Sequence, residues 1–182
     1  MTVSEQKSQI RKAKILERNN LSADKHTELS EIIYKNLIPL VPENSNIALY
    51  YPTQNEVNVI NLFDKFDNIC LPVIAKNSKI MAFHKYLLNK LSRNKFGILE
   101  PDETCEEISP EIIIVPIVAF DRFGYRIGYG GGYYDATINN LQQNKKILTI
   151  GVAFSFQEVD LIPTEAHDKK LDLIITEEKM FE

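Results

Sequence analysis

Five of the chain's seven glycines fall within nine residues, a concentration that indicates a loop with a chemical role: Gly124, Gly128, Gly130, Gly131 and Gly132. Glycine lets the backbone adopt positive φ and approach a ligand closely. Consecutive backbone N–H groups that precede a helix form a site for an anion such as phosphate. Arg126 adds a planar guanidinium, which can bind two phosphate oxygens at once. We therefore expect a phosphate-binding loop in the segment Phe120–Asp135.

This segment matches neither of the common nucleotide-binding motifs. No Gly-Lys-Ser/Thr follows the glycines, as a Walker A loop requires, and Tyr133 stands where the dinucleotide fingerprint has its third glycine. A flexible surface turn is the simpler alternative, although a plain turn rarely needs five glycines interleaved with an arginine. Half of the chain's tyrosines also lie here and offer rings that can stack on a flat heterocycle: Tyr125, Tyr129, Tyr133 and Tyr134.

A second source of positive charge lies near the start of the chain. Four basic residues are spaced i, i+4, i+7 and i+11, which places them within about 60° of one helical face: Lys7, Arg11, Lys14 and Arg18. Three apolar residues on the neighbouring face are expected to pack the helix against the protein: Ile10, Ala13 and Leu16. This basic stripe could reach the outer phosphates of a nucleotide or a polyanionic tail. The alternative is an ordinary solvated face.

Three carboxylates are candidates for the remaining chemistry. Asp135 falls in the first turn of the helix expected after the glycines, and Asp168 lies in a polar loop before the last strand. One or two carboxylates together with phosphate oxygens are the usual ligands of Mg²⁺ in nucleotide enzymes. Glu56 follows the end of an expected strand, where it could accept paired N–H donors from a pterin-like or purine-like ring. Alternatively, Glu56 is a stabilising charge at the N-terminus of a helix.

Alternating helices and strands must position these residues. The pattern predicts helices over Val3–Asn19, from Ser22 as N-cap to the prolines Pro39 and Pro42, and over Glu56–Phe66 and Tyr133–Gln143. Short apolar runs predict buried strands over Ile47–Tyr51, Ile69–Ile74, Lys79–Phe83, Ile112–Val118, Ile147–Phe154 and Leu171–Thr176. This alternation is typical of an α/β domain with a mostly parallel sheet. In such sheets, ligands bind outside the carboxyl ends of the strands.

Composition limits the remaining possibilities. The 182 residues fit one domain spanning 1–182, and 44% hydrophobic and 25% charged residues are typical of a globular protein. A net charge of −4 argues against a nucleic-acid partner. The isolated cysteines Cys70 and Cys105 favour a reducing compartment. The longest apolar run, Ile112–Phe120, is too short to cross a bilayer. We expect a cytoplasmic protein without nucleic-acid or membrane partners.

The segment Arg-Ile-Gly-Tyr-Gly-Gly-Gly-Tyr-Tyr-Asp, residues 126–135, closely resembles the 5-formyltetrahydrofolate cyclo-ligase family, and weaker matches follow the family order along nearly the whole chain. These are Lys7-x-x-Ile-Arg11, Tyr51-Pro-x-x-x-Glu56-Val57, Gly97–Pro101, Pro116–Asp121, Gln157 and Pro163…His167-Asp168. The resemblance implies a three-layer α/β sandwich like that of sugar-phosphate isomerases and CoA transferases. It also implies small-molecule substrates, with ATP as co-substrate and Mg²⁺ as cofactor. We expect a monomer rather than an oligomer. The implied reaction converts 5-formyltetrahydrofolate and ATP to 5,10-methenyltetrahydrofolate, ADP and phosphate through a phosphorylated imine-like intermediate.

The resemblance also implies roles for single residues. Arg126 corresponds to a catalytic residue, and Asp135 and Asp168 to metal ligands. The implied ATP-binding residues are Lys7, Arg11, Arg126, Ile127, Gly128, Tyr129, Gly130, Gly131, Gly132, Tyr133 and Tyr134. The implied folate-binding residues are Tyr51, Glu56, Met81, Phe83 and Tyr133. Ala136 stands where many members of the family have arginine, so one phosphate or tail contact is in doubt. Two other functions stay open: a different ATP-dependent ligase or kinase on the same scaffold, and a sensing module that binds ligand without turnover.

Overall fold

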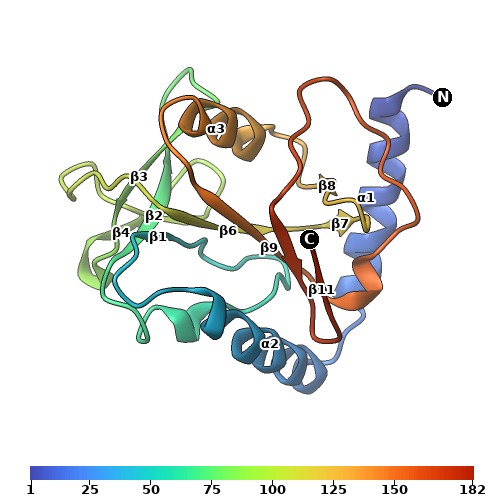
Figure 1. The fold of residues 1–182 in the computed structure, drawn as a ribbon, viewed down its shortest axis with the longest axis horizontal. Coiled ribbons are helices and arrows are strands. Elements are labelled where there is room, and N and C mark those ends of the chain that lie inside the picture. The colour runs from blue at the N-terminus through green and yellow to red at the C-terminus, as the bar shows by residue number, and fades with distance from the viewer.

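The computed structural model describes all 182 residues and arranges them around a seven-strand sheet (Figure 1). The strand order is β11-β10-β9-β6-β1-β2-β3. All pairs in the centre of the sheet are parallel, and only the edge strands β3 and β11 are antiparallel to their neighbours. The strands are β1 (Ile47–Ala48), β2 (Ile69–Ile74), β3 (Met81–Lys85), β6 (Ile112–Pro116), β9 (Leu148–Val152), β10 (Leu173–Ile175) and β11 (Met180–Phe181). The expectation of an α/β protein with a mostly parallel sheet is confirmed.

Helices cover both faces of this sheet. In Figure 1, α2 (Ala23–Leu37) lies below the sheet and α3 (Tyr133–Gln142) above it. Ile33 and Leu37 of α2 pack into one apolar core, and Ile138 of α3 packs into a second core on the opposite face. Burying such apolar side chains contributes about 1.5–3 kcal/mol each, so the two cores fix the helices to the sheet.

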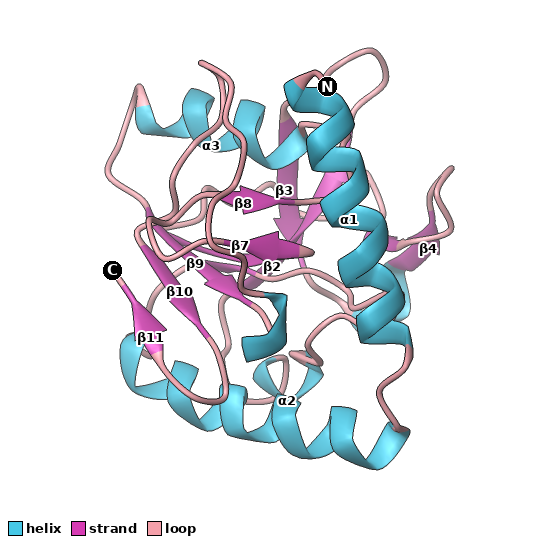
Figure 2. Ribbon diagram, turned by 90° about the vertical axis from the view of Figure 1, so that its right-hand side faces the viewer, coloured by secondary structure: helices cyan, strands magenta, loops and turns pink.

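The remaining elements flank the sheet. Helix α1 (Val3–Asn19) runs beside the short hairpin of β7 (Ala119–Phe120) and β8 (Arg126–Ile127), as Figure 2 shows. A second hairpin, β4 (Leu91–Arg93) with β5 (Leu99–Pro101), follows β3 along the chain. The structure contains no helix of sufficient length and apolar character to cross a bilayer.

The helices expected over Val3–Asn19, after Ser22 and over Tyr133–Gln143 are confirmed, but the one expected over Glu56–Phe66 is wrong. Only a single 3₁₀ turn, Ile60–Leu62, forms there. Val57 and Val59 are both buried, a spacing of two that suits extended chain rather than a helix. The observed strands agree in position with the expected ones but several are shorter, and β3 begins two residues later than expected, at Met81.

Helix α1 has the predicted bounds but the opposite orientation. Leu16 is 65% exposed and Ala13 also faces solvent, whereas Arg18 is only 1% exposed. Of the expected apolar face, only Ile10 packs inward, against the small core at Ile127. The expectation that Ala13 and Leu16 hold the helix down is therefore wrong. The basic stripe faces the protein because Arg11, Lys14 and Arg18 donate hydrogen bonds to main-chain carbonyl oxygens there.

The order of the strands creates a place for a ligand. From β1 the chain moves to β2 on one side, whereas β6, β9 and β10 follow on the other side. The segments that leave the carboxyl ends of β1 and β6 therefore diverge, and such a switch point is where open α/β sheets bind ligands.

Candidate active site

A cavity of about 910 Å³ opens at this switch point. Its walls come from the first half of α1, the segment after β1, the β4–β5 hairpin, the glycine-rich loop and the segment 165–168. Every residue to which the family resemblance assigns a role lines this cavity except Phe83. Residues far apart in the chain, such as Lys7 and Asp168, are thus brought together.

The glycine-rich loop, residues 128–132, forms one wall of the cavity and leads directly into α3. Gly132 precedes the helix at its N-cap position with φ 72°, and Gly130 has φ 94°. A Cβ atom at Gly131 would lie 2.6 Å from the ring of Tyr133, so this position also requires glycine. Arg11 Nε donates to the carbonyl oxygen of Gly128 at 2.7 Å. The loop thus presents a helix N-terminus, which carries partial positive charge, to the cavity.

Arg126 links the loop to the segment before β10. The guanidinium is buried and donates from Nη2 to Asp135 Oδ1 at 3.1 Å and from Nη1 to the carbonyl oxygen of Lys169 at 2.7 Å. The same Asp135 oxygen accepts the Lys169 backbone N–H at 3.1 Å. Burial lowers the pKa of Arg126, and the charge of Asp135 opposes that change. This arrangement fixes the guanidinium at the cavity wall before any ligand arrives.

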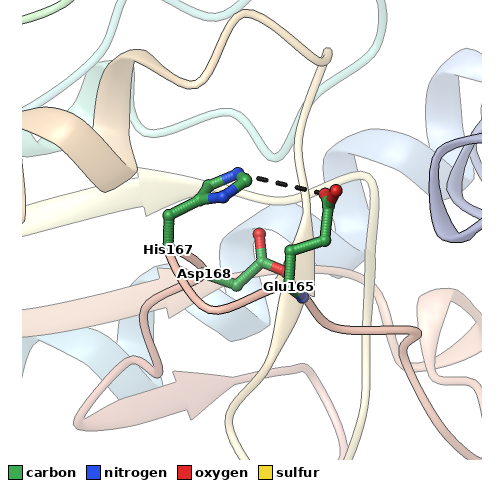
Figure 3. A group of neighbouring side chains, drawn as sticks. All are labelled: Glu165, His167 and Asp168. Carbon is green, nitrogen blue, oxygen red and sulfur yellow. Dashed lines mark hydrogen bonds and ion pairs between the residues drawn. The ribbon is translucent and has the colours of Figure 1, made fainter.

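Lys7 makes a second ionic link across the cavity mouth. Its Nζ lies 2.6 Å from Asp168 Oδ2 and 3.1 Å from Glu165 Oε2. Partial burial alone would lower the pKa of Lys7, but the hydrogen bonds and charges of both carboxylates together raise it. Figure 3 shows Glu165, His167 and Asp168 side by side, and the side-chain donor atoms of the three lie within 4.8 Å of one another.

The carboxylates of Asp135 and Asp168 each keep one oxygen that could bind a metal ion. Each uses one oxygen for its protein partners, Oδ1 of Asp135 and Oδ2 of Asp168, and the second oxygen of each has no hydrogen-bond partner in the protein. Both residues line the cavity. Hard oxygen ligands of this kind are the ones that Mg²⁺ prefers, usually completed by phosphate oxygens and water.

The other half of the basic stripe is held by the protein itself. Lys14 Nζ donates to the carbonyl oxygen of Phe156 and lies 3.0 Å from Glu17 Oε2. Arg18 Nη1 donates to the carbonyl oxygen of Ile117 at 3.3 Å. The interpretation of the stripe as a solvated face is therefore wrong. Lys7 and Arg11 border the cavity, whereas Lys14 and Arg18 do not line it.

Glu56 also lines the cavity, although the residue is only 5% exposed. Oε2 accepts the backbone N–H of Thr53 at 2.8 Å and the Thr53 hydroxyl at 3.2 Å. Burial raises the pKa of Glu56, while the Thr53 hydrogen bonds and the charge of Arg18 act in the opposite direction. Because no helix begins at Glu56, the alternative of a helix-stabilising charge is wrong.

Aromatic and apolar side chains complete this half of the cavity. Tyr51 packs edge-on against Phe63, with ring centroids 6.3 Å apart, and Met81 lies in the lining. The expectation for Phe83 is wrong. Phe83 lies two residues further along β3, is buried, and packs into the second core with Ile138 of α3.

Sequence reasoning missed two contributors. The turn between β4 and β5 places Phe96 and neighbouring residues in the cavity lining, with Phe96 edge-on to Tyr133 at 6.3 Å. The sequence signal for this turn is Gly97, which adopts φ 76°. His26 Nε2 lies 2.8 Å from the carbonyl oxygen of Glu56. No local pattern around His26 indicates this contact, because it joins α2 to a loop thirty residues later.

Comparisons with known proteins show the family and the fold. A model of the 5-formyltetrahydrofolate cyclo-ligase family matches residues 3–177. The 5-formyltetrahydrofolate cyclo-ligase of Haemophilus influenzae is 33% identical over 171 residues, which cover 87% of this chain and 91% of the relative. The Mycoplasma pneumoniae enzyme of the same name is 30% identical over 94% of this chain and 99% of its own. The NMR structure of Aquifex aeolicus 5,10-methenyltetrahydrofolate synthetase aligns with TM-score 0.80 and 33% identity, covering 96% of this chain and 91% of that one.

Proposed function

The chain belongs to the 5-formyltetrahydrofolate cyclo-ligase family, and from this premise we propose that it converts 5-formyltetrahydrofolate to 5,10-methenyltetrahydrofolate with hydrolysis of ATP. The observation that carries the proposal is a cavity lined both by the glycine-rich loop and by the buried Glu56. A phosphate-binding loop and an acceptor for ring N–H groups then face the same space, as a reaction between a nucleotide and a pterin requires.

The nucleotide occupies the glycine-rich side in this proposal. Its phosphates lie against the backbone of residues 128–132 at the N-terminus of α3, where the partial positive charge favours an anion. Lys7 and Arg11 reach the cavity from α1 and bring charge to the outer phosphates. Arg126 is the catalytic residue, since its guanidinium is fixed beside the loop and can stabilise the charge that develops on the transferred phosphoryl group.

Mg²⁺ would be held by the free carboxylate oxygens of Asp135 and Asp168. When bound there, the ion supplies neutralisation of phosphate charge and helps to align the phosphates for displacement. Arg126 and Lys7 orient the two carboxylates through their ion pairs, so the protein fixes the ligand oxygens in advance.

The folate occupies the other side. Glu56 accepts N–H groups of the pterin, and Tyr51, Met81 and Tyr133 form walls for the ring. The formyl oxygen attacks the γ-phosphorus and ADP leaves. Nitrogen 10 of the folate then attacks the activated carbon, and phosphate departs with the former formyl oxygen. Both the nucleophilic oxygen and the nitrogen belong to the substrate, so the protein's work is positioning and electrostatic stabilisation.

The test is a direct assay. Purified protein mixed with 5-formyltetrahydrofolate and MgATP should develop the near-ultraviolet absorbance of the methenyl product, with one ADP released for each product molecule. Omitting ATP, or replacing it with a non-hydrolysable analogue, should abolish the signal. Well-folded protein that forms no ATP-dependent methenyl product would refute the proposal. ADP release with other small substrates alone would point to a different ATP-dependent ligase or kinase.

A further inference from the structure

Helix α2 fixes the main chain that carries Glu56, although no residue of α2 lines the cavity. His26 Nε2 lies 2.8 Å from the carbonyl oxygen of Glu56. A carbonyl oxygen can only accept, so the ring nitrogen is the donor in this contact. Ser30 Oγ accepts the backbone N–H of Asn58 at 3.1 Å. Because residues 26 and 30 are one turn apart on α2, they share a face of the helix. Two hydrogen bonds from that face therefore fix the main chain on both sides of Val57.

Packing orients the side chains that make these bonds. The His26 ring lies edge-on to the buried ring of Phe154, with ring centroids 5.4 Å apart, and Ser30 is itself buried. A third bond comes from Tyr50, whose hydroxyl donates to the carbonyl oxygen of Val57 at 2.7 Å. Each of residues 56, 57 and 58 therefore has a main-chain group bonded to a side chain from another part of the fold.

The turn that precedes Glu56 has an unfavourable backbone. Gln54 has φ 48° and Asn55 has φ 58°. Residues with a Cβ disfavour this left-handed region, although asparagine tolerates it better than glutamine. Such a conformation persists only where the surrounding structure determines it. The Glu56 N–H closes the turn on the carbonyl oxygen of Thr53 at 2.9 Å. The hydrogen bonds of residues 56–58 then stabilise the turn against relaxation from its other end.

The position of the Glu56 carboxylate depends on the bond to His26. The carbonyl oxygen of Glu56 has no other hydrogen-bond partner in the protein. An unpaired carbonyl in a buried residue is costly, so without the His26 donor the oxygen would turn toward water. That rotation of the main chain would move the carboxylate away from Thr53, which donates to Oε2 at 2.8 and 3.2 Å.

We propose that His26 and Ser30 are positioning residues for folate binding: α2 fixes the main chain of residues 56–58 and thereby places the Glu56 carboxylate at the cavity wall. This inference rests on the proposed function, because it assumes that Glu56 accepts N–H groups of the pterin. Neither residue contacts a substrate. Their effect concerns the folate and not ATP, since no hydrogen bond joins α2 to the glycine-rich loop.

The first test is His26→Phe in the full-length protein, with Thr27→Ala as the matched control. Phenylalanine keeps a ring for packing against Phe154 but has no N–H to donate. The dissociation constant and KM for 5-formyltetrahydrofolate should rise about fivefold, as expected for the net loss of one hydrogen bond. KM for ATP should stay within about twofold of wild type. Thr27 is exposed, and its hydroxyl bonds only within α2, to the carbonyl oxygen of Ala23. Its variant should change none of these quantities.

Two further variants distinguish positioning from a general loss of stability. His26→Gln should restore most of the folate affinity, because the glutamine amide can donate to the same carbonyl oxygen. In a Glu56→Ala background, His26→Phe should cause less than about a twofold further loss, because the hydrogen bond acts only through the carboxylate. A loss that arose from destabilised protein would be the same in both backgrounds.

The outcomes separate the positioning role from the proposed function. Equal rises in KM for both substrates, unchanged folate affinity, or a full additional loss in the Glu56→Ala background would overturn the positioning role while the wild-type enzyme is active. Wild-type protein that binds no 5-formyltetrahydrofolate in calorimetry refutes the proposed function, and the positioning role with it. Ser30→Ala removes the acceptor of the Asn58 N–H and should repeat the selective loss of folate affinity. Should His26→Phe fail to fold, Ser30→Ala decides the proposal by itself.

Discussion

The carboxylates beside the glycine-rich loop and the carboxylate of Glu56 differ in how the protein compensates their charge. On the glycine-rich side, the carboxylates form ion pairs: Asp135 with Arg126 at 3.1 Å, and Asp168 and Glu165 with Lys7 at 2.6 and 3.1 Å. On the opposite side, Glu56 is buried without an ion pair and burial raises its pKa. The first side is assembled by the protein before a ligand arrives. The second retains a carboxylate whose compensation is incomplete until a ligand supplies N–H donors.

This difference explains how one small cavity can bind two ligands by different means. Charge pairs made in advance give a rigid frame for the phosphates, which fits a side that must align atoms for displacement. An under-compensated carboxylate costs stability in the free protein and gains its missing hydrogen bonds on binding. Mutations on the glycine-rich side should therefore lower both stability and activity. Mutation of Glu56 should lower activity but raise stability.

The largest effect on activity is expected from Arg126→Ala, which removes the cation that pairs with Asp135. It leaves Asp135 without its cation and the Lys169 carbonyl without a donor. We expect kcat/KM to fall more than tenfold, equivalent to at least about 1.4 kcal/mol of transition-state stabilisation. The free energy of unfolding should fall by about 3 kcal/mol, as for other broken buried pairs. Steady-state kinetics and denaturant titration measure the two quantities.

Arg122→Ala is the control for this experiment. Arg122 lies in the same segment, is exposed, and its guanidinium packs over the ring of Phe123 at 4.9 Å. It should retain wild-type kinetics, and its stability should change by less than about 0.5 kcal/mol. Wild-type kcat/KM in Arg126→Ala would contradict the assignment of the catalytic residue.

Glu56→Gln should show the opposed effects on the other side. Affinity for 5-formyltetrahydrofolate should fall at least about tenfold, because a hydrogen bond to a charged acceptor is lost. Since the folded state raises the pKa of Glu56, the native protein binds the proton more tightly than the unfolded chain. Stability from this group is therefore lost as the pH rises from the ordinary carboxyl pKa through the raised one. Glu56→Gln has no titrating carboxyl at this position, so its stability does not fall over this pH range.

Thermal unfolding at several pH values checks the sign. Relative to wild type, Glu56→Gln should gain more stability at neutral pH than at acidic pH, where the wild-type carboxyl is already protonated. The exposed Glu43 supplies the matched variant, Glu43→Gln, which should show no such trend. A Glu56→Gln protein that binds folate as wild type does would remove Glu56 from the site.

The sequence revealed the glycine-rich side more fully than the Glu56 side, for a physical reason. Backbone shape and helix polarity on the glycine-rich side come from contiguous residues, so glycine spacing between Gly128 and Gly132 suffices to predict a loop and the helix after it. The Glu56 side is assembled from separate short segments. His26 contacts the Glu56 carbonyl oxygen only through the tertiary fold, and no local pattern indicates this contact.

Helix α1 shows more clearly what local sequence patterns cannot predict. The periodicity predicted its bounds and its stripe of basic residues, but not the direction that the stripe faces. That direction depends on main-chain carbonyls at Gly128, Ile117 and Phe156, which accept from the basic side chains. Hydrophobicity alone favours burying Leu16 instead. Hydrogen bonds across more than ninety residues reverse that preference, and they cannot be inferred from spacing.

The smallest effect should come from Gly132→Ala, which tests how much of the glycine-rich side depends on backbone shape rather than charge. A Cβ there would meet only the side chain of Lys79, Nζ at 3.6 Å and Cδ at 3.9 Å, which are ordinary contacts, so the cost arises from φ 72° alone. We expect a loss of about 1 kcal/mol in the free energy of unfolding, since a left-handed conformation disfavours alanine. Gly128→Ala is the matched control for stability, because its Cβ would meet no atom within 4 Å and its φ is not positive. Gly132→Asn should fall between wild type and Gly132→Ala, because asparagine tolerates this region better than alanine. Equal losses for alanine and asparagine in denaturant titrations would mean that side-chain bulk, not φ, makes glycine necessary at the entrance to α3.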